Sequence, residues 1–417
     1  MKISILTYGC AANQADSEAM AGLLKEVGFD VSFGEDPKSD LLIVNTCIVK
    51  GPTENKIIRK LQDLSKAGRK VIVAGCMYEA YPDVAKKFPD FLFMGTNPVD
   101  VVEAVSDVAR EPVKRLAIKP LRTNPFIEII PISQGCLGRC AYCSVKLARG
   151  NLRSYTTKDI VAKVKAAVAD GVKEVWLTSQ DNGCYGLDIG TNLAGLLKLV
   201  AAVPGDFKVR VGMMNPGHVI PFLDELIEVF KDEKIYNFIH VPVQSGSDAV
   251  LKRMRRGYTT KQFKEIVSRF RKAMDMNIST DIIVAFPGET DADLKKTLNL
   301  LEETKPDVLN LSKYWKRRGT EAYDMEQVPL AVSKERGKAV AELFSKLSKG
   351  KDKKWLGWTG EILLTDSKNG YLVGRNQQYK PVLVKRDKDL LGKICSVRIT
   401  DVSKGDYKGE RVAPISS

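Results

Sequence analysis

Ser133-Gln134-Gly135-Cys136-Leu137-Gly138-Arg139-Cys140-Ala141-Tyr142-Cys143 is the stretch of the 417-residue sequence that most constrains its fold and chemistry. The three cysteines follow a CxxxCxxC spacing, and thiolates are the ligands that iron–sulfur clusters and zinc prefer. A standard [4Fe–4S] cluster takes four cysteines, so three cysteines leave one iron open. A zinc site needs a fourth Cys or His nearby, and none lies between Cys143 and Cys184. The spacing therefore favours an open iron–sulfur cluster.

This loop, followed by alternating strands and helices, resembles the radical S-adenosylmethionine (SAM) superfamily. The resemblance implies that the open iron binds the amino and carboxylate groups of SAM. It implies that an electron then cleaves SAM to a 5′-deoxyadenosyl radical. It also implies a partial (β/α)6 barrel, for which the sequence offers six candidate strands: Phe126–Ile132, Glu174–Thr178, Val209–Met213, Asn237–Val241, Ser279–Ala285 and Val308–Leu311.

Polar residues follow several of these strands, and in β/α barrels chemistry lies at the carboxyl ends of the strands. We expect them to form the SAM pocket, although each could equally be a structural polar residue in a turn. The candidates are Ser179, Gln180, Asp181, Asn215, Gln244 and Ser245. Cys184 lies in a glycine-rich loop of the same region and is interpreted as a bystander.

The first 120 residues alternate short apolar stretches with helical patterns, which predicts a doubly wound parallel sheet. The candidate strands are Lys2–Leu6, Asp40–Asn45, Lys70–Ala74 and Phe91–Met94. Cys10, Cys47 and Cys76 each follow one of the first three strands, so they should meet at the carboxyl edge of the sheet. The alternative is three buried cysteines that act as small apolar side chains. Their repeated placement favours a second cluster with three protein ligands and one open iron.

Two three-cysteine sites in this order resemble the methylthiotransferases of the radical SAM superfamily. Thr7–Glu18, Asn45–Glu54 and Leu147–Tyr155 are similar to the archaeal and eukaryotic branch, which acts on threonylcarbamoyladenosine in tRNA. The resemblance implies two [4Fe–4S] clusters, SAM, and transfer of a methylthio group to carbon 2 of that adenosine at position 37. One local difference is Arg317-Arg318-Gly319-Thr320, where relatives have Arg-Pro-Gly-Thr.

The tail is β-rich after a basic amphipathic helix, Val332–Leu356. Its short strands predict a small antiparallel barrel of OB-like kind, and it resembles the TRAM domain, an RNA-binding module. The expected strands are Glu361–Leu364, Tyr371–Val373, Pro381–Val384 and Ile394–Thr400. The alternative is a stabilising cap that binds nothing. Side chains suited to RNA bases and phosphates lie here and beside the cluster loop: Arg149, Arg153, Arg375, Asn376, Tyr379 and Lys380.

Composition agrees with an RNA partner. The formal net charge of +14 favours a polyanion, although a basic surface without such a partner would look the same. The chain has only two histidines, so histidine-centred acid–base catalysis is thinly supported. Eight cysteines without a signal peptide indicate reduced thiols in the cytoplasm, and no apolar run is long enough to span a membrane.

We therefore expect three domains: 1–120, a methylthiotransferase domain with the auxiliary cluster; 121–355, the radical SAM core; and 356–417, the TRAM domain. A linker is expected over Arg110–Asn124. The expected enzyme is a transferase that uses tRNA and an electron donor such as a ferredoxin or flavodoxin. Three alternatives remain: methylthiolation of isopentenyladenosine in tRNA, methylthiolation of a ribosomal protein, and a non-catalytic iron–sulfur protein that binds RNA.

Overall fold

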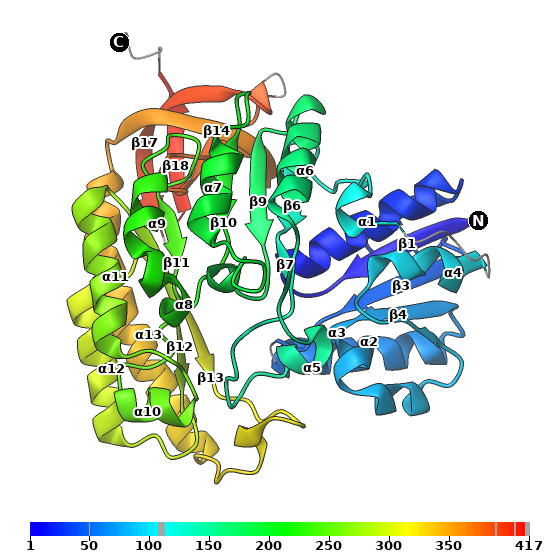
Figure 1. The fold of residues 1–417 in the computed structure, drawn as a ribbon, viewed down its shortest axis with the longest axis horizontal. Coiled ribbons are helices and arrows are strands. Elements are labelled where there is room, and N and C mark those ends of the chain that lie inside the picture. Colours follow the sequence, from blue (N-terminus) through cyan, green and yellow to red (C-terminus); the bar gives the residue numbers. More distant parts are fainter. Residues whose placement is uncertain (50, 107–112, 388–389, 404–405, 413–417) are drawn as a thin grey trace.

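The computed structural model describes residues 1–49, 51–106, 113–387, 390–403 and 406–412. Figure 1 shows a parallel N-terminal sheet beside a central half-open barrel, and a small C-terminal barrel at the far end of the central strands. Part of the predicted linker, residues 110–112, lies outside the described residues. No helix in the described ranges is long and apolar enough to cross a membrane.

The N-terminal sheet has the strand order β2-β1-β3-β4-β5, and every pair is parallel. Apolar side chains alternate between its two faces: Ile3 and Ile43 pack under α1 and α4, whereas Leu42 and Val44 pack under α2. Both faces are therefore covered, which confirms the doubly wound sheet. The elements are β1 Lys2–Thr7, α1 Ala11–Glu26, β2 Asp30–Phe33, β3 Leu41–Thr46, α2 Gly51–Lys66, β4 Val71–Gly75, α3 Cys76–Ala80, β5 Leu92–Phe93 and α4 Val101–Ser106.

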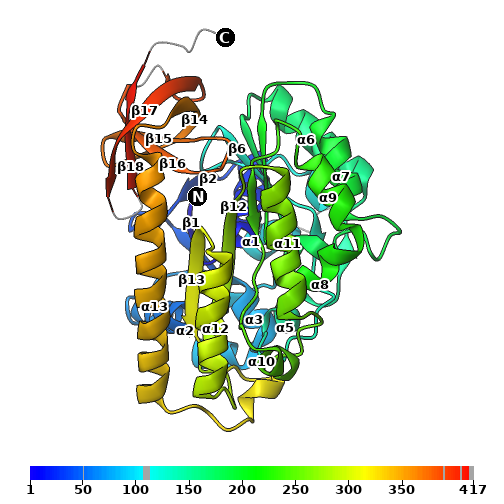
Figure 2. The same ribbon diagram turned by 90° about the vertical axis from the view of Figure 1, so that its left-hand side faces the viewer.

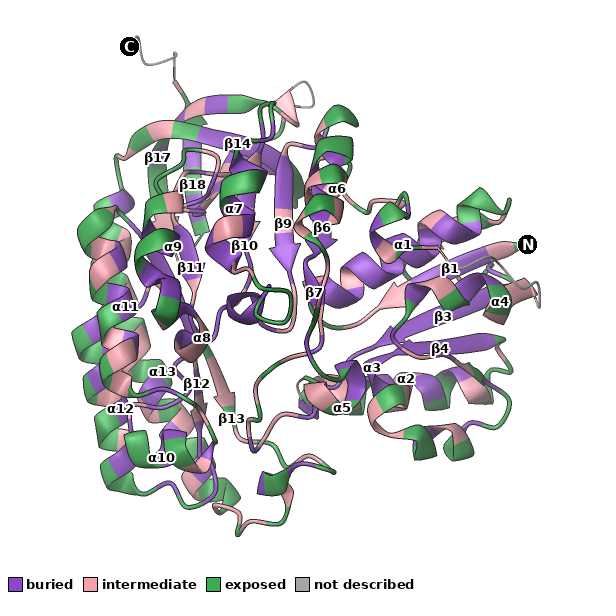
Figure 3. Ribbon diagram, in the orientation of Figure 1, coloured by how far each residue is buried: buried purple, intermediate pink, exposed green. Residues whose placement is uncertain are grey.

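The central domain has six parallel strands in chain order, in two groups of three that a bridge between Val209 and Ile235 connects. Helices cover the outside, as Figures 1 and 2 show, and the strands between them are largely buried in Figure 3. The strands are β6 Ile127–Pro131, β9 Glu174–Thr178, β10 Lys208–Val211, β11 Phe238–His240, β12 Asn277–Val284 and β13 Val308–Lys313. In the described residues β6 and β13 do not pair, so the barrel stays open, as predicted.

Threonine caps fix where several outer helices begin. The Thr156 hydroxyl accepts a hydrogen bond from the Asp159 amide at 3.1 Å, and Thr259 and Thr290 form complete capping boxes. The helices of the central domain are α5 Val145–Arg149, α6 Thr157–Ala169, α7 Leu193–Ala201, α8 Pro216–Val219, α9 Leu223–Val229, α10 Asp248–Arg253, α11 Thr260–Ala273 and α12 Asp291–Thr304. A short pair, β7 Ser133–Gln134 with β8 Arg153–Ser154, frames the CxxxCxxC loop.

The tail begins with α13, Leu330–Asp352, and continues as a closed five-stranded barrel in the order β14-β15-β16-β18-β17. Its interior holds Ile362, Leu372 and Val397, packed against Trp355. The barrel confirms the OB-like prediction, with two additions: the sequence did not indicate β18, and β16 pairs with β18 in parallel. The strands are β14 Thr359–Lys368, β15 Tyr371–Arg375, β16 Pro381–Lys385, β17 Ile394–Ser403 and β18 Asp406–Arg411.

Candidate functional site

Cys10, Cys47 and Cys76 lie together at the carboxyl edge of the N-terminal sheet. Cys10 precedes α1 directly, Cys47 follows β3, and Cys76 is the first residue of α3. β1 and β3 flank the point where the strand order reverses, which is where doubly wound sheets bind ligands. Burial raises the pKa of the Cys47 thiol to about 11, and the neighbouring Cys10 and Cys76 thiols raise it further. Three thiols that influence one another in this way form a donor set suited to an iron–sulfur cluster.

Two polar residues and one glycine hold this edge together. Asn13 donates to the carbonyl of Thr46 at 2.8 Å, and Asn45 donates back to the carbonyl of Asn13 at 2.8 Å, so α1 and β3 are locked to each other. Gly9 has φ of +120°, and a Cβ there would lie 2.7 Å from the Cβ of Cys47. The loop after β1 can therefore approach Cys47 only because residue 9 has no side chain.

The CxxxCxxC loop follows β6 and β7 and runs directly into α5. The Gly138 amide donates to the sulfur of Cys136 at 3.3 Å, and a Cβ at Gly138 would lie within 3.4 and 3.7 Å of the Cys136 and Cys140 sulfurs. Both sulfurs therefore lie on the side of the loop that Gly138 faces. Burial raises the pKa of Cys143 to about 11, with a further contribution from the neighbouring Cys140 thiol. The Arg256 guanidinium donates to the Cys140 sulfur at 3.0 Å.

Cys184 lies beside this loop, which the sequence did not indicate. Its buried thiol donates to the Asp181 carbonyl at 3.2 Å, and its hydrogen bond to Cys136 lowers the pKa of the Cys136 thiol to about 7. The ligand atoms of Asp181, Cys184 and His218 lie within 4.8 Å of one another. The Asp181 carboxylate already accepts bonds from the amides of Gly183 and Asn215, both at 2.9 Å, and lies 2.6 Å from the His218 Nδ1. We interpret Asp181, Cys184 and His218 as a structural group that connects the ends of neighbouring strands.

The six candidate SAM residues surround the same carboxyl face. Ser179 donates to Asn182 at 2.5 Å, Asn215 caps α8, and Ser245 accepts from the Ser247 amide at 3.2 Å. By contrast, the side-chain oxygens of Gln180 and Gln244 are buried and have no hydrogen-bond partner among the described residues. Buried acceptors are nearly always paired in a complete protein. Two free amide oxygens beside the cysteine loop therefore fit a polar cofactor such as SAM.

Five of the six side chains expected to contact RNA are enclosed by protein. Arg149 is 4% exposed and pairs with Asp16 at 2.7 Å. Tyr379 stacks on Tyr236 and Phe238, with ring centroids at 4.8 and 5.2 Å, and Arg375 lies over the Tyr379 ring at 4.2 Å. Arg149, Asn376, Tyr379 and Lys380 are buried, Arg375 is half-buried against the Tyr379 ring, and Arg153 alone is exposed.

In this structure those five side chains pack against protein, so their contact with RNA stays a prediction. In the barrel, the turn between β15 and β16 docks on the amino ends of the central strands. The Asn237 amide donates to the Gln377 carbonyl at 2.7 Å, and Asn277 donates to the Gln378 carbonyl at 2.9 Å. Cations, amides and aromatics suit a domain interface as well as they suit RNA. Composition alone therefore could not distinguish the two.

Arg317-Arg318-Gly319-Thr320 forms a tight turn without a proline. The Thr320 amide donates to the Arg317 carbonyl at 3.3 Å, and Gly319 has φ of +72°, as the third residue of a type II turn requires. The Arg317 guanidinium donates to the carbonyls of Ile48 and Val49. The turn therefore joins the central domain to the loop that carries Cys47.

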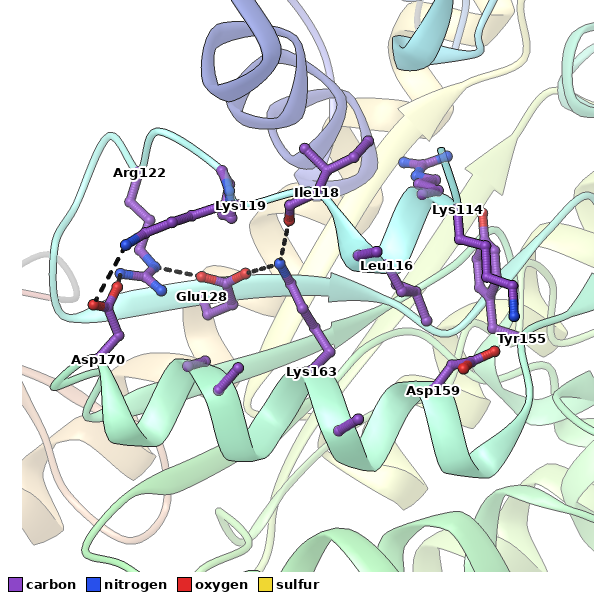
Figure 4. A pocket seen from close by; sticks show the side chains of 16 residues that line it. Lys114, Leu116, Ile118, Lys119, Arg122, Glu128, Tyr155, Asp159, Lys163 and Asp170 are labelled. Atoms are coloured by element: carbon purple, nitrogen blue, oxygen red, sulfur yellow. Dashed lines mark hydrogen bonds and ion pairs between the residues drawn. The ribbon is translucent and has the colours of Figure 1, made fainter. Parts of the chain in front are cut away.

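A cavity of about 550 Å³ lies away from the cysteines, between residues 114–122 of the predicted linker and α6. Figure 4 shows one group of its charged side chains paired with one another, around Glu128 and Asp170. Glu128 is bonded to Arg122 and lies 3.2 Å from Lys163, while Arg122 also reaches Asp170 at 2.6 Å. These ion pairs fasten α6 to the preceding segment, whereas Figure 4 draws no pairing for Lys114 or Asp159, which also line the cavity.

Three family profiles match the chain: the Radical SAM superfamily over residues 130–301, the uncharacterized protein family UPF0004 over residues 2–95, and the TRAM domain over residues 357–412. Among solved structures, the radical S-adenosylmethionine methyltransferase TsrM from Kitasatospora setae, with cobalamin and a [4Fe-4S] cluster bound, is similar with a TM-score of 0.55. It is 14% identical over 77% of each chain, so it shows the fold alone. Profiles and fold together define a radical SAM protein with an N-terminal sheet domain and a TRAM barrel.

Named relatives narrow this class. The probable threonylcarbamoyladenosine tRNA methylthiotransferase of Pyrococcus abyssi is 42% identical over 399 residues, covering 92% of this chain and 93% of that protein. The threonylcarbamoyladenosine tRNA methylthiotransferase of Homo sapiens is 37% identical over 438 residues, covering 99% of this chain and 74% of the human protein. The chain belongs to the threonylcarbamoyladenosine tRNA methylthiotransferase family, which confirms the resemblance found in its sequence.

Proposed function

We propose that this protein transfers a methylthio group to carbon 2 of threonylcarbamoyladenosine at position 37 of tRNA. The observation that carries the proposal is the pair of cysteine triads at two carboxyl edges, in a chain of this family. Cys136, Cys140 and Cys143 would hold the cluster that binds SAM, and Cys10, Cys47 and Cys76 would hold the auxiliary cluster. When bound, these groups supply reductive cleavage of SAM and the sulfur to be transferred.

The protein's own side chains bind and orient rather than exchange protons. The C–H bond at carbon 2 of adenine is not acidic enough for a side-chain base, so radical chemistry replaces the general base. Gln180 and Gln244 would each use the unpaired side-chain oxygen to receive a hydrogen bond from SAM. Ser179, Asp181, Asn215 and Ser245 would shape the pocket through the strand-end bonds described above.

The domain boundaries, the reductant and the compartment belong to the same proposal. We place the boundaries near residues 120 and 355, where the linker and the end of α13 separate the three hydrophobic cores. A low-potential protein such as a ferredoxin or flavodoxin would supply the electron. The cytoplasm suits the chain because eight cysteines remain reduced there.

The test uses anaerobically reconstituted protein, SAM, a reductant and an anticodon stem–loop RNA that carries threonylcarbamoyladenosine. Mass spectrometry of its nucleosides should show the methylthio derivative with the wild type. The Cys47→Ala variant should retain about half of the iron and still form 5′-deoxyadenosine, yet give no methylthio product. A stem–loop with isopentenyladenosine and a ribosomal protein fraction serve as rival substrates. Modification of either rival in place of the first RNA would contradict the proposal.

A further inference from the structure

Apolar side chains are exposed around both cysteine sites. Val49, two residues after Cys47, is 47% exposed, and Leu137, inside the CxxxCxxC loop, is 49% exposed. Leu147 on α5 is 44% exposed, and Trp315, just after β13, is 46% exposed. Trp315 is the only exposed residue among the four tryptophans. Exposed apolar groups that gather beside a reaction site indicate that something docks there.

Three of these residues lie on segments that contact one another, and they are here called the Trp315 patch: Val49, Leu147 and Trp315. A Cβ built on Gly51 would lie 2.4 Å from the Trp315 ring, so the indole rests on the backbone that follows Val49. A Cβ built on Gly319 would lie 3.0 Å from Leu147, so the same loop also reaches α5. In Figure 1 this loop, which follows β13, passes below α5. The patch thus joins both cysteine sites.

The edge of the patch is cationic. Lys313, Lys316 and Arg318 are exposed, and residues 313–318 contain no carboxylate. Arg318 reaches Asp83 at 3.3 Å, but both side chains remain more than half exposed. An aromatic ring flanked by cations matches unpaired nucleotides, whose bases stack and whose phosphates pair with Lys and Arg. It matches a membrane poorly, because only three apolar side chains are presented.

The TRAM barrel and the two cysteine sites lie at opposite ends of the central strands. The barrel docks at the amino ends of the central strands, through Gln377 and Gln378, whereas both cysteine sites lie at carboxyl ends. The barrel therefore lies at the end of the domain away from the reacting base. A base that leaves its stack to reach such a site costs a few kcal/mol in lost stacking. An aromatic side chain beside the site can offset that loss.

Resting on the proposed function, we propose that Trp315 stacks on a nucleotide next to the target base, while Lys316 and Arg318 hold the adjacent phosphates. The Arg317 bonds to the carbonyls of Ile48 and Val49 fix this loop against the Cys47 segment. An anticodon loop bound to Trp315 would therefore lie at a fixed position relative to the auxiliary site.

Binding of a fluorescent anticodon stem–loop to the anaerobically reconstituted protein tests this role. Trp315→Ala should weaken binding about tenfold, equivalent to about 1.4 kcal/mol, and Trp315→Phe should retain most of the affinity. Leu199→Ala, at an equally exposed apolar residue on α7, is the matched control and should bind as the wild type does. Iron content and 5′-deoxyadenosine formation without RNA should be the same in all four proteins. RNA should also quench tryptophan emission in the wild type far more than in Trp315→Phe.

The outcomes separate this inference from the function on which it rests. If the wild type binds and modifies the stem–loop and Trp315→Ala binds equally well, the stacking role is wrong and the function stands. If the wild type neither binds nor modifies the RNA, both fail. Polyglutamate of the same total charge as the stem–loop tests whether the surface recognises charge alone. If polyglutamate displaces the stem–loop, and Trp315→Ala changes the binding of neither polyanion, the inference is overturned.

Discussion

Two arginines contact cysteine sulfurs, and their charges are balanced differently. Arg149 hydrogen-bonds Cys76 and also pairs with the buried Asp16 at 2.7 Å. Arg256 donates to Cys140 at 3.0 Å, and the other groups it meets are Tyr258 and a backbone carbonyl. Among the described residues no carboxylate lies in ion-pair distance of Arg256. The negative charge of the cysteine thiolates, or of the cluster that they would hold, would therefore balance the positive charge of Arg256.

Replacing Arg256 should lower the reduction potential of the cluster held by Cys136, Cys140 and Cys143. A hydrogen bond to sulfur and a nearby positive charge both stabilise the reduced, more negative cluster. At a fixed solution potential, we expect Arg256→Met to reduce the ratio of reduced to oxidised cluster about tenfold. For one electron this equals a decrease of about 59 mV in the reduction potential. A redox titration monitored by EPR measures this reduction potential, in a Cys47→Ala background that removes the auxiliary cluster. The neighbouring Arg255, which pairs with Glu321 at the surface, gives the control Arg255→Met. An unchanged potential would show that Arg256 has only a packing role.

Gly9 should be indispensable for the auxiliary site alone. A Cβ there would lie 2.7 Å from Cys47, closer than real Cβ contacts allow, so Gly9→Ala must displace Cys47. We expect the reconstituted variant to keep about half of the iron and to retain 5′-deoxyadenosine formation. Gly28 also has a positive φ, of +91°, but faces open space, so Gly28→Ala separates backbone strain from crowding. Full iron in Gly9→Ala would mean that the three cysteines do not share a site.

At the scale of the element, the short apolar stretches of the sequence located all six central strands. The missed strands include β2, a four-residue edge strand, and the polar β18. β18 reads Asp-Tyr-Lys-Gly-Glu-Arg and gains its buried side only when the barrel closes. The sequence also predicted where Cys10, Cys47 and Cys76 meet, because the carboxyl ends of parallel strands share one edge of the sheet. The contact of Cys184 with Cys136 depends on a turn that no pattern in the sequence describes.

Asp307 ties α13 to the central barrel, and acid should loosen that tie. Its carboxylate lies 2.7 Å from Lys351 on α13 and accepts from the Ile278 amide at 3.0 Å. Burial raises the pKa of Asp307, but Lys351 and these hydrogen bonds lower it more, so the net pKa falls below the usual value. Its contribution to stability is therefore present above the unfolded pKa of about 3.9 and is lost as pH falls through the folded value.

Asp307→Asn should remove this pH dependence and speed hydrogen exchange in α13 at neutral pH, because Lys351 loses its partner. Hydrogen exchange followed by mass spectrometry, at pH 7 and at acid pH, measures both effects. Lys338→Gln, which breaks only the exposed pair with Glu342, is the matched change on the same helix. Equal exchange in the wild type and Asp307→Asn would show that α13 is held by its apolar contacts alone.

At the scale of the whole molecule, Tyr379 decides how the TRAM barrel sits on the core. It is 9% exposed, stacks on Tyr236 and Phe238, and has φ of +59°, a left-handed conformation that costs a non-glycine residue about 1–2 kcal/mol. The interface must offset that cost. Tyr379→Ala should therefore release the barrel, at a loss of about 3 kcal/mol as for other buried aromatics.

Without RNA, Tyr379→Ala should increase the radius of gyration in X-ray scattering and speed hydrogen exchange in the segment between β15 and β16. A residue that only contacts RNA would change neither quantity. Tyr371→Ala, in the same barrel but at the far end of β15, should leave both unchanged. tRNA affinity should fall in Tyr379→Ala as well, because the barrel and the Trp315 patch would no longer hold the RNA at a fixed separation. If affinity falls while scattering and exchange stay constant, Tyr379 contacts RNA directly, and the buried interface described here opens when tRNA binds.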